Sequence, residues 1–93
     1  MADLLSDSEI KERASLLSGP TVEGRKLRCT RSFKDFIGAI AFVNKLVAPS
    51  EAAGHHPDIE ISYNKVTVNL TTHDAGGLTE KDLALAQEIS ALN

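Results

Sequence analysis

Residues 59–71 read IEISYNKVTVNLT, and this stretch decides the fold. Every second residue on both sides of Asn64-Lys65 is apolar: Ile59, Ile61 and Tyr63 before the pair, and Val66, Val68 and Leu70 after it. A period of two is typical of strands with one buried face, and a two-residue connection is typical of antiparallel hairpins. The stretch therefore predicts a β-hairpin with its turn at residues 64–65 and with Tyr63 on the core-facing side.

The segments around this hairpin carry the signals of three helices and two further strands. Ser6 and Glu9 form a capping box for a helix over 6–18, and Thr79 with Asp82 at position N3 marks the start of a helix over 79–91. We expect strands at 22–23, 26–30, 59–63 and 66–71, and a central helix over 32–48 that ends before Pro49. The order α-β-β-α-β-β-α predicts an α+β fold, in which helices cover one face of a single four-stranded antiparallel sheet.

Size and charge exclude several classes of protein. A chain of 93 residues is typical of one domain, which we expect to span residues 1–93. Its net charge of −3 argues against direct binding to nucleic acid. The single Cys29 cannot form an internal disulfide, the N-terminus is not signal-like, and no apolar run approaches the ~20 residues of a membrane span. We therefore expect a cytoplasmic protein without membrane contacts.

The central helix is apolar over an unusually wide arc. Phe36, Ile40, Val43 and Val47 form one stripe, which further apolar residues flank on both sides. The arc spans about 220°, whereas a surface helix needs little more than ~100°. Because one sheet cannot cover such an arc, we expect residues 33–47 to form part of the interface of a homo-oligomer, either a dimer or a tetramer.

The three histidines lie near the open end of the predicted hairpin. A turn at 64–65 pairs Tyr63 with Val66, and the same register places His56 opposite His73. His55 is adjacent to His56 in the chain, so the hairpin is expected to bring all three imidazoles within a ligand's width of each other. Two imidazoles close together can work as an acid and a base near neutral pH.

A metal site is the alternative for the same three side chains. Three histidines can hold a catalytic Zn²⁺. Adjacent residues of an extended chain point in opposite directions, however, and no cysteine or suitably spaced carboxylate pair completes a ligand set. The sequence therefore favours metal-free acid–base chemistry.

The spaced pattern of site residues resembles the signature of the pterin-4a-carbinolamine dehydratases. It comprises Glu51-x3-His55-His56-Pro57-x5-Tyr63-x9-His73-x8-Asp82. Residues 55–86 and 31–47 resemble that family closely, and the resemblance covers about residues 22–92. It implies the α-β-β-α-β-β-α fold and the dehydration of a 4a-hydroxy-tetrahydropterin to the quinonoid dihydropterin, without a metal or an organic cofactor. The product is then reduced to regenerate tetrahydropterin.

The resemblance also implies roles for individual residues. His55 and His73 correspond to the acid–base groups of the family, and Glu51 to a polar residue that supports the site. The residues that correspond to substrate-binding positions are Gly54, His56, Thr71, Thr72 and Asp74. Two motif positions have structural explanations instead: Asp82 as a helix cap, and Tyr63 as a packing residue.

A non-catalytic binding module is the second interpretation of the same sequence. Some relatives of this family serve as dimerisation cofactors of a transcription factor, and some resemble assembly chaperones of a large enzyme. The wide apolar arc of residues 33–47 suits such a role. The presence of His55, His56 and His73 favours catalysis, because a scaffold has no need of them.

Overall fold

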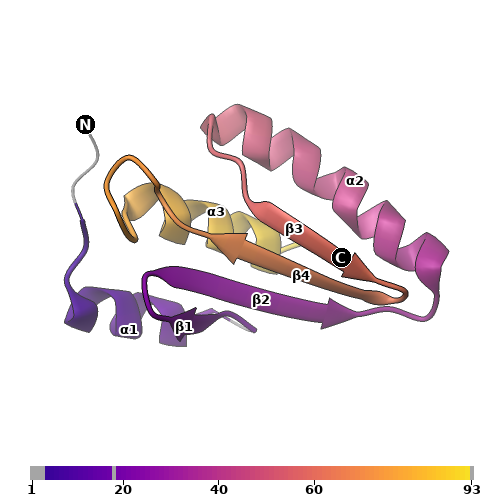
Figure 1. Cartoon of the computed structure of the whole chain (residues 1–93), viewed down its shortest axis with the longest axis horizontal. Coiled ribbons are helices and arrows are strands. Elements are labelled where there is room, and N and C mark those ends of the chain that lie inside the picture. Colours follow the sequence, from indigo (N-terminus) through magenta and orange to yellow (C-terminus); the bar gives the residue numbers. More distant parts are fainter. Residues whose placement is uncertain (1–3, 18, 93) are drawn as a thin grey trace.

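The computed structural model describes residues 4–17 and 19–92, and its elements follow the expected order (Figure 1). The elements are α1 (Asp7–Ser15), β1 (Thr21–Glu23), β2 (Lys26–Ser32), α2 (Phe36–Ala53), β3 (Asp58–Ser62), β4 (Lys65–Leu70) and α3 (Glu80–Ser90). The strands form one antiparallel sheet in the order β1-β2-β4-β3. The predicted α+β fold with a four-stranded antiparallel sheet is therefore confirmed.

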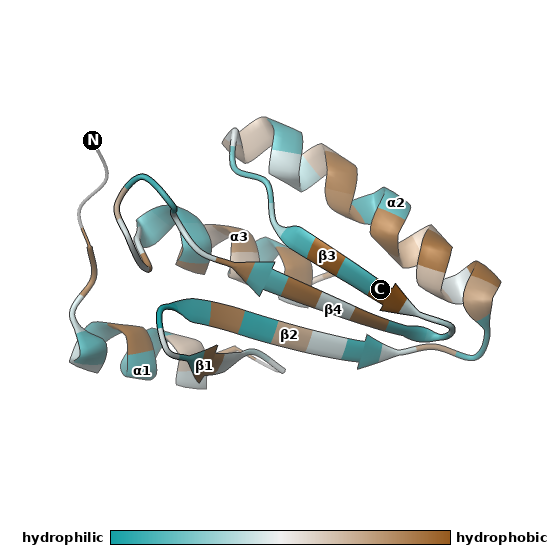
Figure 2. Ribbon diagram, in the orientation of Figure 1, coloured by the Kyte–Doolittle hydropathy of each residue, from teal (hydrophilic) through white to brown (hydrophobic). Residues whose placement is uncertain are grey.

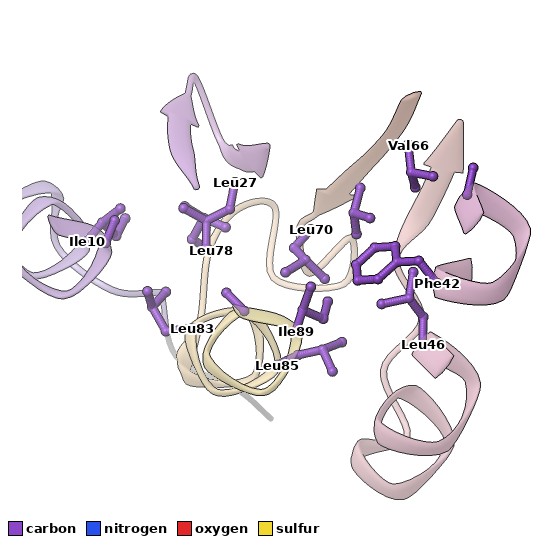
Figure 3. Packing of buried hydrophobic residues seen from close by; sticks show 14 residues of the cluster. Ile10, Leu27, Phe42, Leu46, Val66, Leu70, Leu78, Leu83, Leu85 and Ile89 are labelled. Atoms are coloured by element: carbon purple, nitrogen blue, oxygen red, sulfur yellow. The ribbon is translucent and has the colours of Figure 1, made fainter. Parts of the chain in front are cut away.

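One face of this sheet carries the core. Leu27 on β2 and Val66 and Leu70 on β4 are fully buried. Figure 3 shows Val66 and Leu70 near side chains from α2 and α3, and Leu27 beside Leu78, which precedes α3. The helices contribute Phe42, Leu46, Leu83, Leu85 and Ile89 to the same cluster. Val66, Val68 and Leu70 on β4 are all buried, as predicted, and hydropathy alternates along the strand (Figure 2). Thr67, between Val66 and Val68, is buried as well, so burial itself does not alternate along β4. Burial of this apolar surface is the main favourable term in folding.

The register of the second hairpin differs from the prediction by two residues. Ile61 pairs with Val66 and Ile59 with Val68, so the turn lies at Tyr63-Asn64 rather than at Asn64-Lys65. Asn64 is held here by Phe33, whose carbonyl accepts a hydrogen bond from the Asn64 side chain at 2.8 Å. Tyr63 takes a left-handed conformation (φ 54°) and is exposed, so its predicted packing role is wrong. The predicted opposition of His56 and His73 is wrong for the same reason.

Helix α2 begins and ends later than predicted. Ser32 belongs to β2, and the helix is capped by Asp35, whose side chain accepts a hydrogen bond from the Gly38 N–H at 2.8 Å. Pro49 lies inside the helix, which continues to Ala53. The final turn is closed by Gly54 in the left-handed conformation (φ 61°), which costs glycine little. This additional turn places Glu51 on α2.

The outer helices follow the prediction more closely. Helix α3 has Thr79 as its N-cap and Ala91 as its C-cap, as expected. Helix α1 starts after Ser6, whose hydroxyl accepts from the Glu9 N–H, but it ends at Ser15. The amides of residues 16 and 17 bond to carbonyls three residues back, which tightens the chain at that point. Residue 18, the predicted end, lies outside the described residues.

Helix α2 is also the one helix of the described residues that is long and apolar enough to cross a membrane, by length and composition alone. Four of its residues, Ala39, Phe42, Leu46 and Ser50, are buried against the rest of the chain. Its other apolar side chains, including Phe36, Ile37 and Val47, are exposed. The sheet therefore covers only part of the apolar arc, as the sequence predicts.

Arg31 joins the sheet to the end of α3. Its guanidinium donates to the Leu92 carbonyl at 2.7 Å and lies 4.7 Å from the centroid of the Phe42 ring. A cation at a helix C-terminus also interacts favourably with the helix dipole.

We expect Arg31→Ala to lower the free energy of unfolding by about 1–3 kcal/mol, because it removes a charged hydrogen bond and a cation–π contact. Urea denaturation followed by circular dichroism measures this loss. Arg28→Ala is the matched control, since Arg28 is exposed and lies 3.7 Å from Glu23. Equal losses in the two variants would contradict the role of Arg31.

Candidate active site

The end of α2 positions two adjacent histidines. Gly54 turns the chain away from the helix, and the His55 N–H then donates to the Ser50 carbonyl at 3.1 Å. This hydrogen bond fixes the backbone of His55 against the last turn. The two imidazoles then have different partners and different surroundings.

His55 is held by a buried carboxylate. Its Nε2 lies 2.6 Å from Oδ1 of Asp82, with the His55 side chain 12% exposed and the Asp82 side chain fully buried. Asp82 is the N3 residue of α3, and its Oδ2 accepts from the Thr79 N–H at 2.9 Å. The predicted capping role of Asp82 is therefore confirmed, but the same carboxylate also contacts the site.

Thr72 is the third residue of this buried network. Its hydroxyl lies 2.7 Å from Oδ2 of Asp82 and 2.8 Å from the hydroxyl of Thr79. When the observed register is continued beyond the strands, residue 55 falls opposite residue 72. The correct register would therefore have indicated that His55 and Thr72 approach each other from the two strands of the hairpin.

His56 points to a different carboxylate. Its Nε2 lies 2.5 Å from Oε2 of Glu51, and both side chains are exposed, at 63% and 67%. Glu51 thus contacts His56 rather than His55. A groove of about 190 Å³ opens beside this pair, lined mainly by apolar side chains: Val43, Leu46, Val47, Ser50, Glu51, His56, Pro57 and Ile59.

The remaining predicted residues lie on the loop after β4. The Thr71 hydroxyl donates to the Arg25 carbonyl at 2.8 Å, and the Thr72 N–H donates to the Gly77 carbonyl at 3.0 Å. These bonds tie the start of the loop to the β1–β2 turn and to its own end. His73 and Asp74 lie on this loop, between Thr72 and Gly77, and both are exposed.

The structure thus assembles the predicted residues in two groups. His55 and Thr72 meet at Asp82, whereas His56 meets Glu51. His73 directly follows Thr72, and no hydrogen bond from another residue in 4–17 or 19–92 reaches its ring. Over the same residues, no three His, Cys, Asp or Glu side chains converge as a metal site.

This arrangement can move protons. A buried carboxylate that bonds one nitrogen of an imidazole orients the ring and leaves the second nitrogen available. An exposed imidazole such as His73, which follows Thr72 in the chain, can exchange protons with a ligand and with water. General acid–base catalysis by such groups contributes about 10²–10⁴ to a rate.

An ion pair fixes the start of α3, which carries Asp82. Arg13 on α1 bonds both carboxylate oxygens of Glu80, with Nη2 at 2.8 Å from Oε1. The hydrogen bond from Arg13 lowers the pKa of Glu80 below its ordinary value of 4.5. The same bond raises the pKa of Arg13.

Comparison with known proteins assigns this chain to a family. The sequence model described as pterin 4 alpha carbinolamine dehydratase matches residues 3–92. The chain belongs to this dehydratase family. A relative from a Nostoc species is 72% identical over 93 residues, covers the full length of both chains, and has a name that places it among the pterin-4-alpha-carbinolamine dehydratases. A relative from a Roseiflexus species with the same name is 53% identical over 92 residues and 99% of each chain.

Solved structures of the dehydratase family share the fold. A protein from Brucella melitensis, described as a transcriptional coactivator/pterin dehydratase, has a TM-score of 0.88 and 35% identity, over 96% of this chain and 97% of that one. A pterin dehydratase-like protein described as a RuBisCO assembly factor in the alpha-carboxysome has a TM-score of 0.61 and 26% identity. That match covers 77% of this chain and 83% of the other.

The lowered pKa of Glu80 gives a pH-dependent contribution to stability. A carboxyl group with a lowered pKa stabilises the fold above its unfolded-state pKa, and the contribution is lost as the pH falls through the folded-state value. We expect Glu80→Gln to lower Tm by a few degrees at most at pH 7, because the pair is exposed, and this difference to shrink as the pH falls below the ordinary value of 4.5 towards the lowered pKa of Glu80. Thermal unfolding measured from pH 3 to pH 8 tests this. Glu88→Gln, an exposed change on the same helix, should cause no loss, and a Glu80→Gln difference that stayed constant from pH 8 to pH 3 would contradict the role of the ion pair.

Proposed function

We propose that residues 1–93 act as a single domain that dehydrates a pterin-4a-carbinolamine to the quinonoid dihydropterin, with His55 and His73 as the acid–base pair. Family membership over residues 3–92 supports the reaction. The observation that carries the site is the hydrogen bond between His55 and the buried Asp82, since it orients an imidazole beside a loop that carries a second, exposed one.

The reaction itself needs two proton transfers. A base takes the proton of the ring N–H next to carbon 4a, and the electron pair of that bond forms the C=N bond of the product. The C–O bond breaks with its electron pair on oxygen, and an acid protonates this oxygen so that water leaves. Proton transfers alone complete the step, so the proposed reaction uses neither a metal nor an organic cofactor, and it returns the pterin for reduction.

The substrate would be recognised by the groups that surround the two histidines. Gly54 and His56 lie on one side, with Glu51 supporting His56, and Asp74 offers an exposed carboxylate to the N–H groups of a pterin. Thr71 and Thr72 belong to the same proposed binding loop. Because their hydroxyls already bond Arg25 and Asp82, we infer that they act by fixing the loop.

We also propose a cytoplasmic location and a homo-oligomer, from the cysteine content, the net charge and the exposed apolar surface. Cys29 is the one cysteine of the sequence, and burial raises the pKa of its thiol, which suits a compartment without disulfides. The net charge of −3 disfavours direct binding to nucleic acid. The exposed Phe36, Ile37 and Val47 on α2 favour contact with further copies of the chain, in a dimer or a tetramer.

A non-catalytic binding module is the second candidate. The exposed apolar side chains of α2 favour it, because they can contact a partner protein as well as a second copy. Two structural neighbours are described as a coactivator and as an assembly factor. The two functions are compatible, since α2 presents these side chains on its outer face and the acid–base residues follow its end and β4.

We expect the protein to accelerate the dehydration of chemically prepared 4a-hydroxy-tetrahydropterin, followed by absorbance. His55→Ala and His73→Ala should each lower the rate at least about tenfold, since each removes one proton-transfer group. Lys11→Ala, on the exposed side of α1, is the matched control and should retain the wild-type rate. Equal rates with and without protein would contradict the proposed activity and favour the binding module.

We expect sedimentation at micromolar concentration to show an oligomer, and Ile37→Asp to shift it towards the monomer. Ile37 is 78% exposed, and a charge in an apolar interface opposes association. Leu16→Asp is the control, because Leu16 is 81% exposed but lies at the end of α1. A wild-type monomer, or an equal effect of both variants, would contradict an interface through α2.

A further inference from the structure

Among the described residues, the His55–Asp82 pair differs from the His56–Glu51 pair in one respect that matters for chemistry. Water can compete for both partners in the exposed pair, whereas the carboxylate of Asp82 is fully buried and the ring of His55 nearly so. A hydrogen bond shielded from water holds its proton in place more strictly than an exposed one. The buried pair can therefore define a single tautomer of its imidazole.

The partners of Asp82 determine which tautomer this is. Oδ2 accepts from the Thr79 N–H and from the Thr72 hydroxyl, and Oδ1 faces Nε2 of His55. An ionised carboxylate only accepts hydrogen bonds, so Nε2 must carry the proton that fills this contact. In neutral His55 the lone pair then lies on Nδ1.

We infer that Asp82 is a positioning residue that keeps His55 in the Nε2–H tautomer, so that Nδ1 is the atom through which His55 exchanges a proton with the substrate. This inference rests on the proposed function. Asp82 acts through His55, and its two roles come from different oxygen atoms: Oδ2 caps α3, and Oδ1 orients the ring. The position that defines the start of α3 thereby also selects the working nitrogen.

The variant Asp82→Asn separates these two roles. The amide oxygen of the substituted side chain has to take the place of Oδ2, because only an acceptor satisfies the Thr79 N–H and the Thr72 hydroxyl. The amide NH₂ then points at Nε2 of His55 and donates to it. The proton of the neutral ring moves to Nδ1, which can no longer accept a proton from the substrate.

The first test reads the tautomer without substrate. Long-range ¹⁵N–¹H spectra of the wild-type protein, recorded near pH 9 where an ordinary imidazole is neutral, distinguish a protonated from an unprotonated ring nitrogen. The spectrum of His55→Ala assigns the His55 signals. We expect an Nε2–H pattern for His55, and mixed patterns for the exposed His56 and His73. An Nδ1–H or a mixed pattern at His55 in the wild type would overturn the inference, even if Asp82→Asn failed to fold.

The second test compares matched variants. Asp82→Asn should invert the His55 pattern and lower kcat by about 10²-fold or more with little change in KM, since Asp82 acts on the ring rather than on the substrate. Glu51→Gln, the same change at the exposed pair, should leave the His55 pattern intact. Asp35→Asn is a control for the loss of a capping carboxylate, because Asp35 caps α2. It should change neither the His55 pattern nor kcat. An unchanged His55 pattern in Asp82→Asn would contradict the inference.

These readouts keep the two proposals apart. If the protein fails to dehydrate the pterin but shows the Nε2–H pattern, the proposed function fails and the role of Asp82 in fixing the tautomer stands. If the protein is active and His55 shows the other tautomer, the activity stands and the role of Asp82 is refuted.

Discussion

A single buried carboxylate joins the fold of this protein to its site. Asp82 forms hydrogen bonds with three parts of the chain: Thr79 at the start of its own helix α3, Thr72 on the loop after β4, and His55, 27 residues away, after the turn that ends α2. A buried carboxylate without such donors is strongly destabilising, so these segments have to meet if the protein is to fold. The oxygen atoms that cap the helix and orient His55 belong to one group, and stability and chemistry therefore depend on the same contact.

The two imidazole–carboxylate pairs have similar N···O distances but differ in their burial. The pairs are 2.6 Å and 2.5 Å long, yet Asp82 is fully buried whereas Glu51 is 67% exposed. Coulombic and hydrogen-bond interactions weaken in water, so Glu51 fixes the orientation of the His56 ring less strictly than Asp82 fixes that of His55. His56 is thus suited to adapt to a bound ligand, and His55 is suited to hold one orientation.

The small size of the chain explains why α2 serves the molecule in two ways. One face of α2 packs Ala39, Phe42 and Leu46 against the sheet, and the other face presents apolar side chains to the outside. A chain of this length can bury only a limited core, and association is a common way to bury more. The C-terminal turn of the same helix carries Glu51 and leads into the two histidines. The exposed apolar face and the residues that lead into the site therefore belong to one helix.

The sequence by itself determined the order of the elements, the face of β4 that is buried, the cap of α3 and the presence of histidines near one end of a hairpin. These features are local: they follow from a period of two and from capping residues within one turn of a helix. It did not determine the register, because a shift of two residues keeps Val66 and Val68 on the core face and leaves the hydrophobic pattern unchanged. The end of α2 was predicted too early, before Pro49, because a proline usually ends a helix. The structure shows instead that the helix continues to Ala53 and is closed by Gly54. Only the tertiary structure decided that Asp82 meets His55, since residues 27 positions apart in the chain come together through the packing of α3 beside the end of α2.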